Sequence, residues 1–210
     1  GSGDITITAD KMFLFNTITA TGNRVTLKSL SADQAVDLGS AGKVLFNTLE
    51  LSDSELDQIS ASFLEIGSTT QGAFTVSSDV SPPGVTVAHL ISNSTVTGTA
   101  GGIVVGDLAI EAGGDVNFTD TTTDVNNLAI DATGFDVTFY DADDLDIDTV
   151  DTVVGVKAAT FTTDGPGPLT ETSAIVLDDT ETAEEAAEAV LVEEAVEGSD
   201  GIFLIEFSAP

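Results

Sequence analysis

Residues 108–118 read LAIEAGGDVNF, and residues 128–139 read LAIDATGFDVTF. The leading leucines of the two segments are 20 residues apart, and the valines of DVNF and DVTF are 21 residues apart. A segment that returns after about 20 residues is typical of stacked repeats. Each such unit is too small to bury an apolar face by itself, so it requires a neighbour above and below. The near-repeat therefore predicts a solenoid.

Short runs that alternate apolar with polar residues recur along most of the chain, which is the period of a half-buried strand. The runs are Ile5–Thr8, Phe13–Phe15, Ile18, Val25 with Leu27, Val44–Phe46, Leu49–Leu51, Phe63–Ile66, Phe74–Val76, Val85–Val87, Ile103–Val105, Leu108–Ile110, Val116–Phe118, Leu128–Ile130, Val137–Tyr140, Leu145–Ile147, Val153–Val156 and Ala159–Thr162. Such runs also occur in sandwiches and antiparallel barrels. Their shortness and the fixed offset favour an all-β parallel β-helix with roughly eight coils and a length of about 40 Å.

The chain is strongly acidic, with 36 Asp and Glu residues against five Lys and Arg and a formal net charge of −31. We expect no nucleic-acid partner, because binding phosphates requires a basic surface. We also expect no membrane insertion, because the sequence has no long apolar run of the kind that spans a bilayer. A hydrophobic content of 41% is sufficient for a core. The acidic residues then form either a solvated surface or clustered ligands for Ca²⁺.

The absence of Cys excludes disulfides and thiolate metal sites, and it is compatible with an exported repeat protein. No signal peptide is visible. Residues 1–3 (GSG) resemble a cloning remnant, so we expect a fragment of a longer protein.

Residues 164–168 (DGPGP) are the strongest signal in the sequence for an interruption of the strands. We therefore expect regular coils over residues 4–168 and a capping segment over residues 169–210. Within that segment, residues 182–197 have the composition and the capping box of an acidic helix. A final apolar strand follows. Its residues Ile202, Phe203, Leu204, Ile205 and Phe207 either close the chain's own sheet or form an interaction strand donated to another molecule.

A longer motif begins at Leu49, where the chain reads LELSDSELDQISASFLEIG and then GAFTV. The matching positions are Leu49, Leu51, Ser52, Asp53, Glu55, Leu56, Asp57, Ile59, Ala61, Leu64, Ile66, Gly67, Gly72, Thr75 and Val76. This segment resembles the repeats of large secreted adhesins of the filamentous haemagglutinin type, and the resemblance extends over about residues 4–163. It implies a right-handed parallel β-helix, export through an outer-membrane partner, and a role in adhesion or biofilm.

We consider one acidic run and one histidine as metal-binding or catalytic residues. Asp144, Asp146 and Asp148 alternate with apolar residues on a predicted strand, which places the three carboxylates on one outer face as a candidate Ca²⁺ site or a solvated surface. His89 is the only histidine, and we expect it at a loop or on the coil surface, with no zinc or catalytic role.

The phenylalanines within the strand runs are expected to stack in the core. They are Phe13, Phe15, Phe46, Phe63, Phe74, Phe118, Phe139 and Phe161.

The favoured function is a non-enzymatic stiff spacer and interaction surface in a bacterial adhesin, secreted or displayed at the cell surface. Its expected partners are a host or neighbouring cell surface, or other subunits of the same fibre. Two alternatives remain open. One is a Ca²⁺-dependent module that joins subunits end to end, and the other is a β-helical enzyme acting on polysaccharides, with paired carboxylates as in glycosidases.

Overall fold

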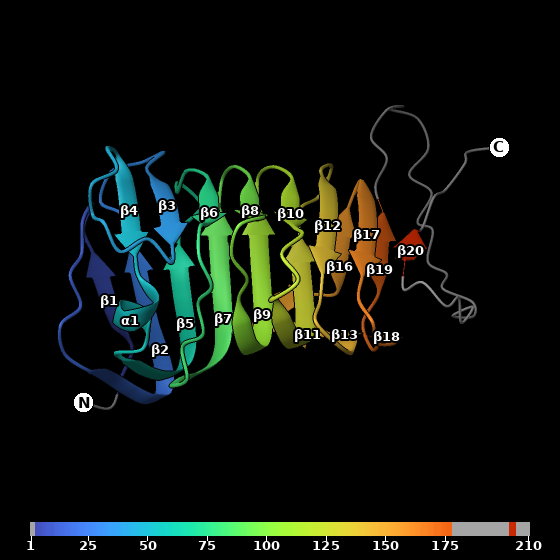
Figure 1. Cartoon of the computed structure of the whole chain (residues 1–210), viewed down its shortest axis with the longest axis horizontal. Coiled ribbons are helices and arrows are strands. Elements are labelled where there is room, and N and C mark those ends of the chain that lie inside the picture. The colour runs from blue at the N-terminus through green and yellow to red at the C-terminus, as the bar shows by residue number, and fades with distance from the viewer. Residues whose placement is uncertain (1–2, 178–201, 205–210) are drawn as a thin grey trace.

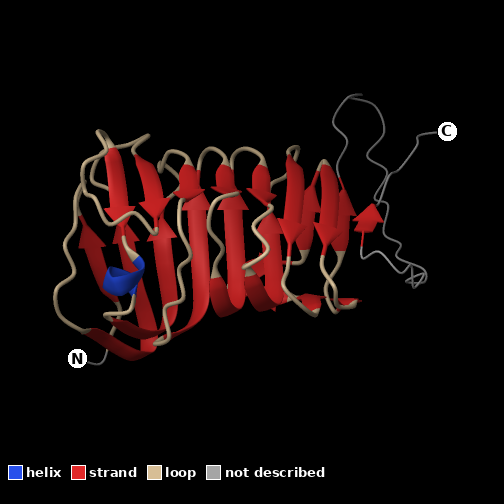
Figure 2. Cartoon of the chain, in the orientation of Figure 1, coloured by secondary structure: helices blue, strands red, loops and turns tan. Residues whose placement is uncertain are grey.

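The computed structural model describes residues 3–177 and 202–204 and shows an all-β solenoid of about eight turns, which confirms the predicted fold class (Figure 1). Two sheets, whose strands are parallel except at the last strand of the second sheet, extend along the long axis and enclose the core. A single short helix interrupts the strands of the described region (Figure 2).

The first sheet contains ten strands, and the second contains eight. The strands of the first sheet are β1 (Ile5–Thr8), β2 (Ile18–Lys28), β5 (Ile59–Gly67), β7 (Val85–Ser92), β9 (Val104–Ala112), β11 (Asp124–Asp131), β13 (Leu145–Ile147), β16 (Val156–Ala158), β18 (Leu169–Glu171) and β19 (Ile175–Leu177). Those of the second sheet are β4 (Thr48–Leu51), β3 (Ala35–Leu38), β6 (Phe74–Val76), β8 (Val96–Gly98), β10 (Val116–Phe118), β12 (Asp136–Tyr140), β17 (Thr160–Asp164) and β20 (Ile202–Leu204). A separate hairpin joins β14 (Thr149–Val150) to β15 (Val153–Val154).

The near-repeat corresponds to adjacent coils. Leu108 of β9 pairs with Leu128 of β11, and Phe118 of β10 pairs with Phe139 of β12. The offset grows from 20 to 21 because the turn after β11 holds one residue more than the turn after β9. In that longer turn Gly134 has a φ of 81°, and Phe135 projects into solvent. The extra residue is therefore accommodated at the surface while both strands keep their register.

Inward side chains form columns along the axis, as stacked parallel coils require. Phe74, Phe118, Phe139 and Phe161 are fully buried, and the rings of Phe118 and Phe139 are 5.4 Å apart. Gly98 lies in the coil before Phe118 and pairs with it. A Cβ atom on Gly98 would lie only 2.3 Å from the Phe118 ring. A glycine at this position thus makes room for the aromatic column.

The predicted inward position of four other phenylalanines is wrong. Phe63 of β5 is partly buried and packs on the outer face of the first sheet, beside Val87. Phe13 and Phe15 are exposed, and Phe46 is 98% exposed. Residues 9–17 form no strand but cross the N-terminal end of the core, where Met12 and Leu14 turn inward. The segment alternates as expected, but the opposite set of side chains faces the core.

Residues 44–46 form a turn rather than the predicted strand. The helix α1 (Asp53–Leu56) was not expected, although the sequence carries its signal. The carboxylate of Glu55 accepts hydrogen bonds from the Ser52 backbone N–H at 3.0 Å and from its hydroxyl at 2.9 Å, which fixes the first turn.

Parallel pairing continues past residue 168, the boundary predicted from the sequence, because β18 pairs with β13 and β19 pairs with β16. The Gly- and Pro-rich loop at residues 165–168 therefore acts as a turn between coils. Strand β20 adds antiparallel to β17, with Ile202 opposite Asp164. The predicted helix at residues 182–197 lies outside the described residues, as do Ile205 and Phe207.

The aromatic column should dominate stability. We expect Phe139→Ala to lower the free energy of unfolding by about 3–5 kcal/mol, because it leaves a cavity beside Phe118. The matched control Phe46→Ala should change it by less than about 0.5 kcal/mol, since that ring is almost fully solvated. Urea titration followed by circular dichroism measures both, and equal losses would contradict the core assignment.

Candidate functional site

A hairpin covers part of the outer face of the first sheet. Strands β14 and β15 leave the coil after β13 and return at β16, and Val150 and Val153 pack against the outer side chains of β7, β9 and β11. Ala109 and Ala129 lie in register there and are fully buried, so two small residues create the space for the hairpin. The prediction that Val153 belongs to a coil strand is wrong.

The return of the hairpin to the coil depends on Gly155. Its φ is 61°, and a Cβ atom there would lie 1.9 Å from the carbonyl oxygen of Ala174. Only glycine fits both conditions. The Gly155 N–H donates to the carbonyl of Asp148 at 3.1 Å, which closes the base of the inserted loop.

Asp151 at the tip of the hairpin binds two cationic or polar side chains from distant coils. Its Oδ1 accepts a hydrogen bond from Arg24 Nη2 at 2.7 Å, and its Oδ2 lies 2.8 Å from His89 Nδ1. Arg24 is 127 residues away in sequence. We call Arg24, Glu65, His89, Glu111 and Asp151 the outer-face cluster.

Register explains how the outer-face cluster assembles. Glu65 of β5 pairs with Thr26 of β2 on one side and with His89 of β7 on the other. Arg24 pairs with Phe63, and the guanidinium lies 5.0 Å from the centroid of that ring. Arg24 Nη1 also donates to Glu65 Oε2 at 3.0 Å. The guanidinium is thus held by a ring and two carboxylates.

The prediction that His89 lies at the surface is wrong, because its side chain is only 3% exposed. Nδ1 lies 2.8 Å from Asp151 Oδ2, and Nε2 lies 3.2 Å from Glu111 Oε1 without forming a hydrogen bond. A histidine oriented by a carboxylate is a common acid–base arrangement. Here the hairpin covers it, so the arrangement serves to anchor the hairpin.

The charge state of Asp151 follows from its partners. Burial raises the pKa of this carboxyl, but hydrogen bonds from Arg24 and His89 outweigh burial and hold the pKa below its ordinary value. Its contribution to stability is therefore present above the ordinary pKa and is lost as pH falls through the lowered one.

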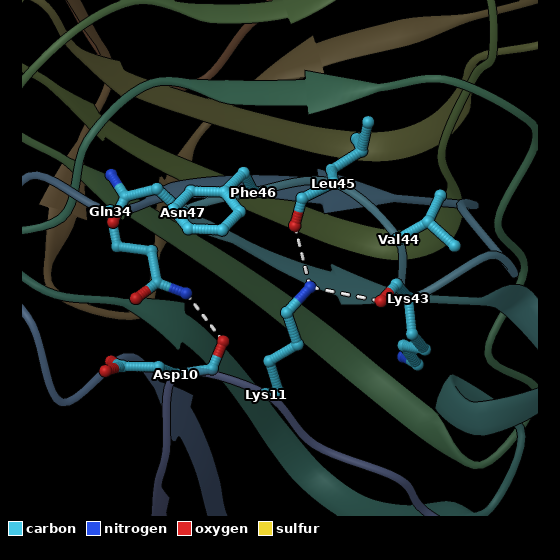
Figure 3. Close-up of a pocket in the computed structure, with 8 residues that line it drawn as sticks. All are labelled: Asp10, Lys11, Gln34, Lys43, Val44, Leu45, Phe46 and Asn47. Atoms are coloured by element: carbon cyan, nitrogen blue, oxygen red, sulfur yellow. Dashed lines mark hydrogen bonds between the residues drawn. The ribbon is translucent and has the colours of Figure 1, made fainter.

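A second polar site lies at the N-terminal end of the solenoid (Figure 3). Residues 10, 11, 34 and 43–47 line an open depression there. Lys11 Nζ donates to the carbonyls of Leu45 at 2.7 Å and Lys43 at 3.1 Å, and Gln34 Nε2 donates to the carbonyl of Asp10 at 2.6 Å. Figure 3 shows Lys11, from the segment at residues 9–17 that crosses this end, in contact with the loop at residues 43–47, and Gln34 in contact with Asp10.

Two buried carboxylates fix the same loop. Glu50 accepts hydrogen bonds from Ser40 Oγ at 2.8 Å and the Leu45 N–H at 2.9 Å, and it pairs with Lys11 at 3.3 Å. Burial raises the pKa of Glu50, but these donors outweigh burial, and the pKa lies below its ordinary value. Glu55 pairs with Lys43 in the same way, and its pKa is also lowered against the effect of burial. The loop is therefore held in one conformation.

Of the three candidate Ca²⁺ ligands, only Asp146 lies within β13, where it is partly exposed between the buried Leu145 and Ile147, and Asp144 and Asp148 flank the strand. Asp146 accepts hydrogen bonds from Thr172, and Asp148 accepts one from Ser173 at 3.2 Å. Among the residues that the structure describes, no group of three or more His, Cys, Asp or Glu side chains is arranged to hold a metal ion.

Asp141, in the same acidic run, is buried. Its two oxygens accept hydrogen bonds from the Val125 N–H at 3.0 Å and the Asp143 N–H at 3.2 Å. Burial is the largest effect on its ionisation, and repulsion from Asp124 and Asp143 adds to it, so the pKa of Asp141 rises to about 6.

Comparisons with protein-family models, curated proteins and solved structures gave no match. The resemblance to filamentous haemagglutinin-type adhesins thus stays a prediction from residues 4–163. Within residues 3–177 and 202–204, no helix is both long enough and apolar enough to cross a bilayer.

We expect Asp151→Asn to lower the free energy of unfolding by about 1–3 kcal/mol, because charge-assisted hydrogen bonds to Arg24 and His89 are lost. A double-mutant cycle with Arg24→Met, measured by urea unfolding, should show a coupling energy above about 0.5 kcal/mol. Asp120→Asn is the control, because the side chain of Asp120 bonds to Thr122, only two residues away. Additive effects would disprove the anchoring contact.

Asp141 should make stability depend on pH. Because its folded pKa is raised, its contribution is fully present below the ordinary pKa of 3.8 and is lost as pH rises through about 6. Replacement by Asn should remove this dependence, so the difference in Tm between about pH 3.5 and about pH 7, values that enclose that window, should shrink in Asp141→Asn. The exposed Asp144→Asn should leave the wild-type difference intact. An identical pH profile for all three chains would contradict the assignment.

Proposed function

We propose that the chain is a stiff, non-enzymatic spacer segment of a large bacterial adhesin that is secreted or held at the cell surface. The observation that carries this proposal is one continuous hydrophobic core, which extends from residues packed beside β1 to Ile175 of β19. Bending such a rod would open ladder hydrogen bonds on one side and compress packed columns on the other.

The outer-face cluster supports the spacer proposal. In a solenoid most contacts join neighbouring coils, so resistance to bending is a local property. The Asp151–Arg24 contact instead joins the hairpin after β13 to β2, across the strands β5, β7, β9 and β11. It acts as a diagonal brace on one face of the rod.

The acidic surface suits an extended, exported segment. With a formal net charge of −31, neighbouring copies repel one another, which favours solubility and separation. Adhesion to a host or neighbouring cell would then involve outward side-chain rows or other parts of the longer protein.

The spacer proposal predicts a cooperative mechanical response. Asp4→Cys and Glu171→Cys supply pulling handles on a chain with no other Cys. We expect one main rupture in single-molecule force spectroscopy, and a lower rupture force when Asp151→Asn removes the brace. Asp120→Asn in the same background should rupture like the parent chain.

The proposal would be contradicted if the coils were released one after another and if Asp151→Asn did not change the forces of release. Turnover of acidic or neutral glycans by the purified chain would favour the enzyme alternative. A rise in Tm with Ca²⁺ that a chelator reverses would favour the Ca²⁺-dependent module. Loss of that rise in Asp146→Asn would then locate the Ca²⁺ site at Asp146.

A further inference from the structure

Exposed apolar side chains gather at the N-terminal end of the solenoid. Of the nine large hydrophobic residues that are exposed in the described region, five lie on the two segments that cross this end. We call them the N-terminal apolar surface: Phe13, Phe15, Val44, Leu45 and Phe46. A contiguous surface of this kind on a soluble protein usually marks an interaction site.

The two segments lie side by side, so the exposed side chains form one surface. Lys11 Nζ contacts the Leu45 carbonyl, and Lys43 Nζ lies 5.7 Å from the Phe13 ring centroid. The rings of Phe13 and Phe15 stack at 5.8 Å with an interplanar angle of 8°. Ion pairs with buried Glu50 and Glu55 hold both segments, so little conformational entropy remains to be lost on binding.

The charge of the chain is distributed unevenly along the rod. Of the residues that the structure describes, those up to residue 50 include five acidic and four basic residues, whereas residues 51–177 include 20 acidic residues and one basic residue. The N-terminal apolar surface therefore belongs to a nearly neutral end. Two copies that each carry a formal −31 repel least when these ends meet.

We propose that the N-terminal apolar surface docks onto the same surface of a second copy, so that two rods join head to head. An isologous contact buries the surface on both partners at once. It also places the two acidic regions at opposite ends of the pair, as far apart as the rods allow. The proposal is independent of the spacer function, because it needs only the surface and the charge distribution.

Sedimentation velocity over a concentration series tests the proposal. We expect the wild-type chain to shift from monomer to dimer, and the shift to strengthen with added salt, which screens the acidic regions. The double variant Phe15→Asp with Phe46→Asp should weaken dimerisation at least about tenfold, since each charge would be buried at the contact. Phe135→Asp, an exposed phenylalanine outside the surface, is the matched control.

The orientation has its own test, because the chain has no Cys. We expect Phe46→Cys alone to form a disulfide-linked dimer on mild oxidation, whereas Thr99→Cys, at an exposed position of a bend, should not. A wild-type chain that stays monomeric at every concentration would overturn the proposal. So would unchanged dimerisation of the double variant, or growth beyond dimers, which indicates head-to-tail contacts.

Discussion

Parallel backbone pairing between successive coils is the constraint on which the rest of this molecule depends. Each strand hydrogen-bonds to its equivalent one coil away, so side chains fall into rows that run along the axis. Inward rows must be apolar and sterically compatible from coil to coil, as Gly98 beneath Phe118 illustrates. The two ends, where pairing stops, need separate covers. Residues 9–17 and β20 occupy these positions.

The outward rows use the same register for a different purpose. Successive small residues at 109 and 129 leave a shallow track, and larger polar residues at 65 and 89 continue the row toward β2. The hairpin lies in the track, and Asp151 reaches the polar part. The same outward row contains Ala109, Ala129 and His89. The long-range contact between Asp151 and His89 therefore follows from the pairing of neighbouring coils.

The sequence predicted the solenoid because a repeated register leaves a repeated pattern, and the segments around Leu108 and Leu128 are paired as their similarity indicates. The prediction failed where the sequence does not indicate which side of an extended segment is buried. Residues 12–15 (MFLF) are apolar at every position, so only the packing of Met12 decides which side faces inward. The prediction of a surface position for His89 failed for another reason. The side chain is buried beneath a hairpin whose Asp151 lies 62 residues later in the sequence. No local signal marks such a contact.

Stacked coils would also place carboxylates of neighbouring coils close together, which a chain with five basic residues cannot offset with ion pairs alone. Neutral donors perform that role here. Asn127 donates to Asp107 at 2.7 Å, Thr160 donates to Asp136 at 2.7 Å, and Thr172 donates to Asp146 at 2.9 Å. Each of these hydrogen bonds joins one coil to the next. A carboxylate that would otherwise repel the carboxylates of the neighbouring coil instead accepts a hydrogen bond from that coil. These Asn and Thr donors therefore help to keep parallel stacking compatible with an acidic surface.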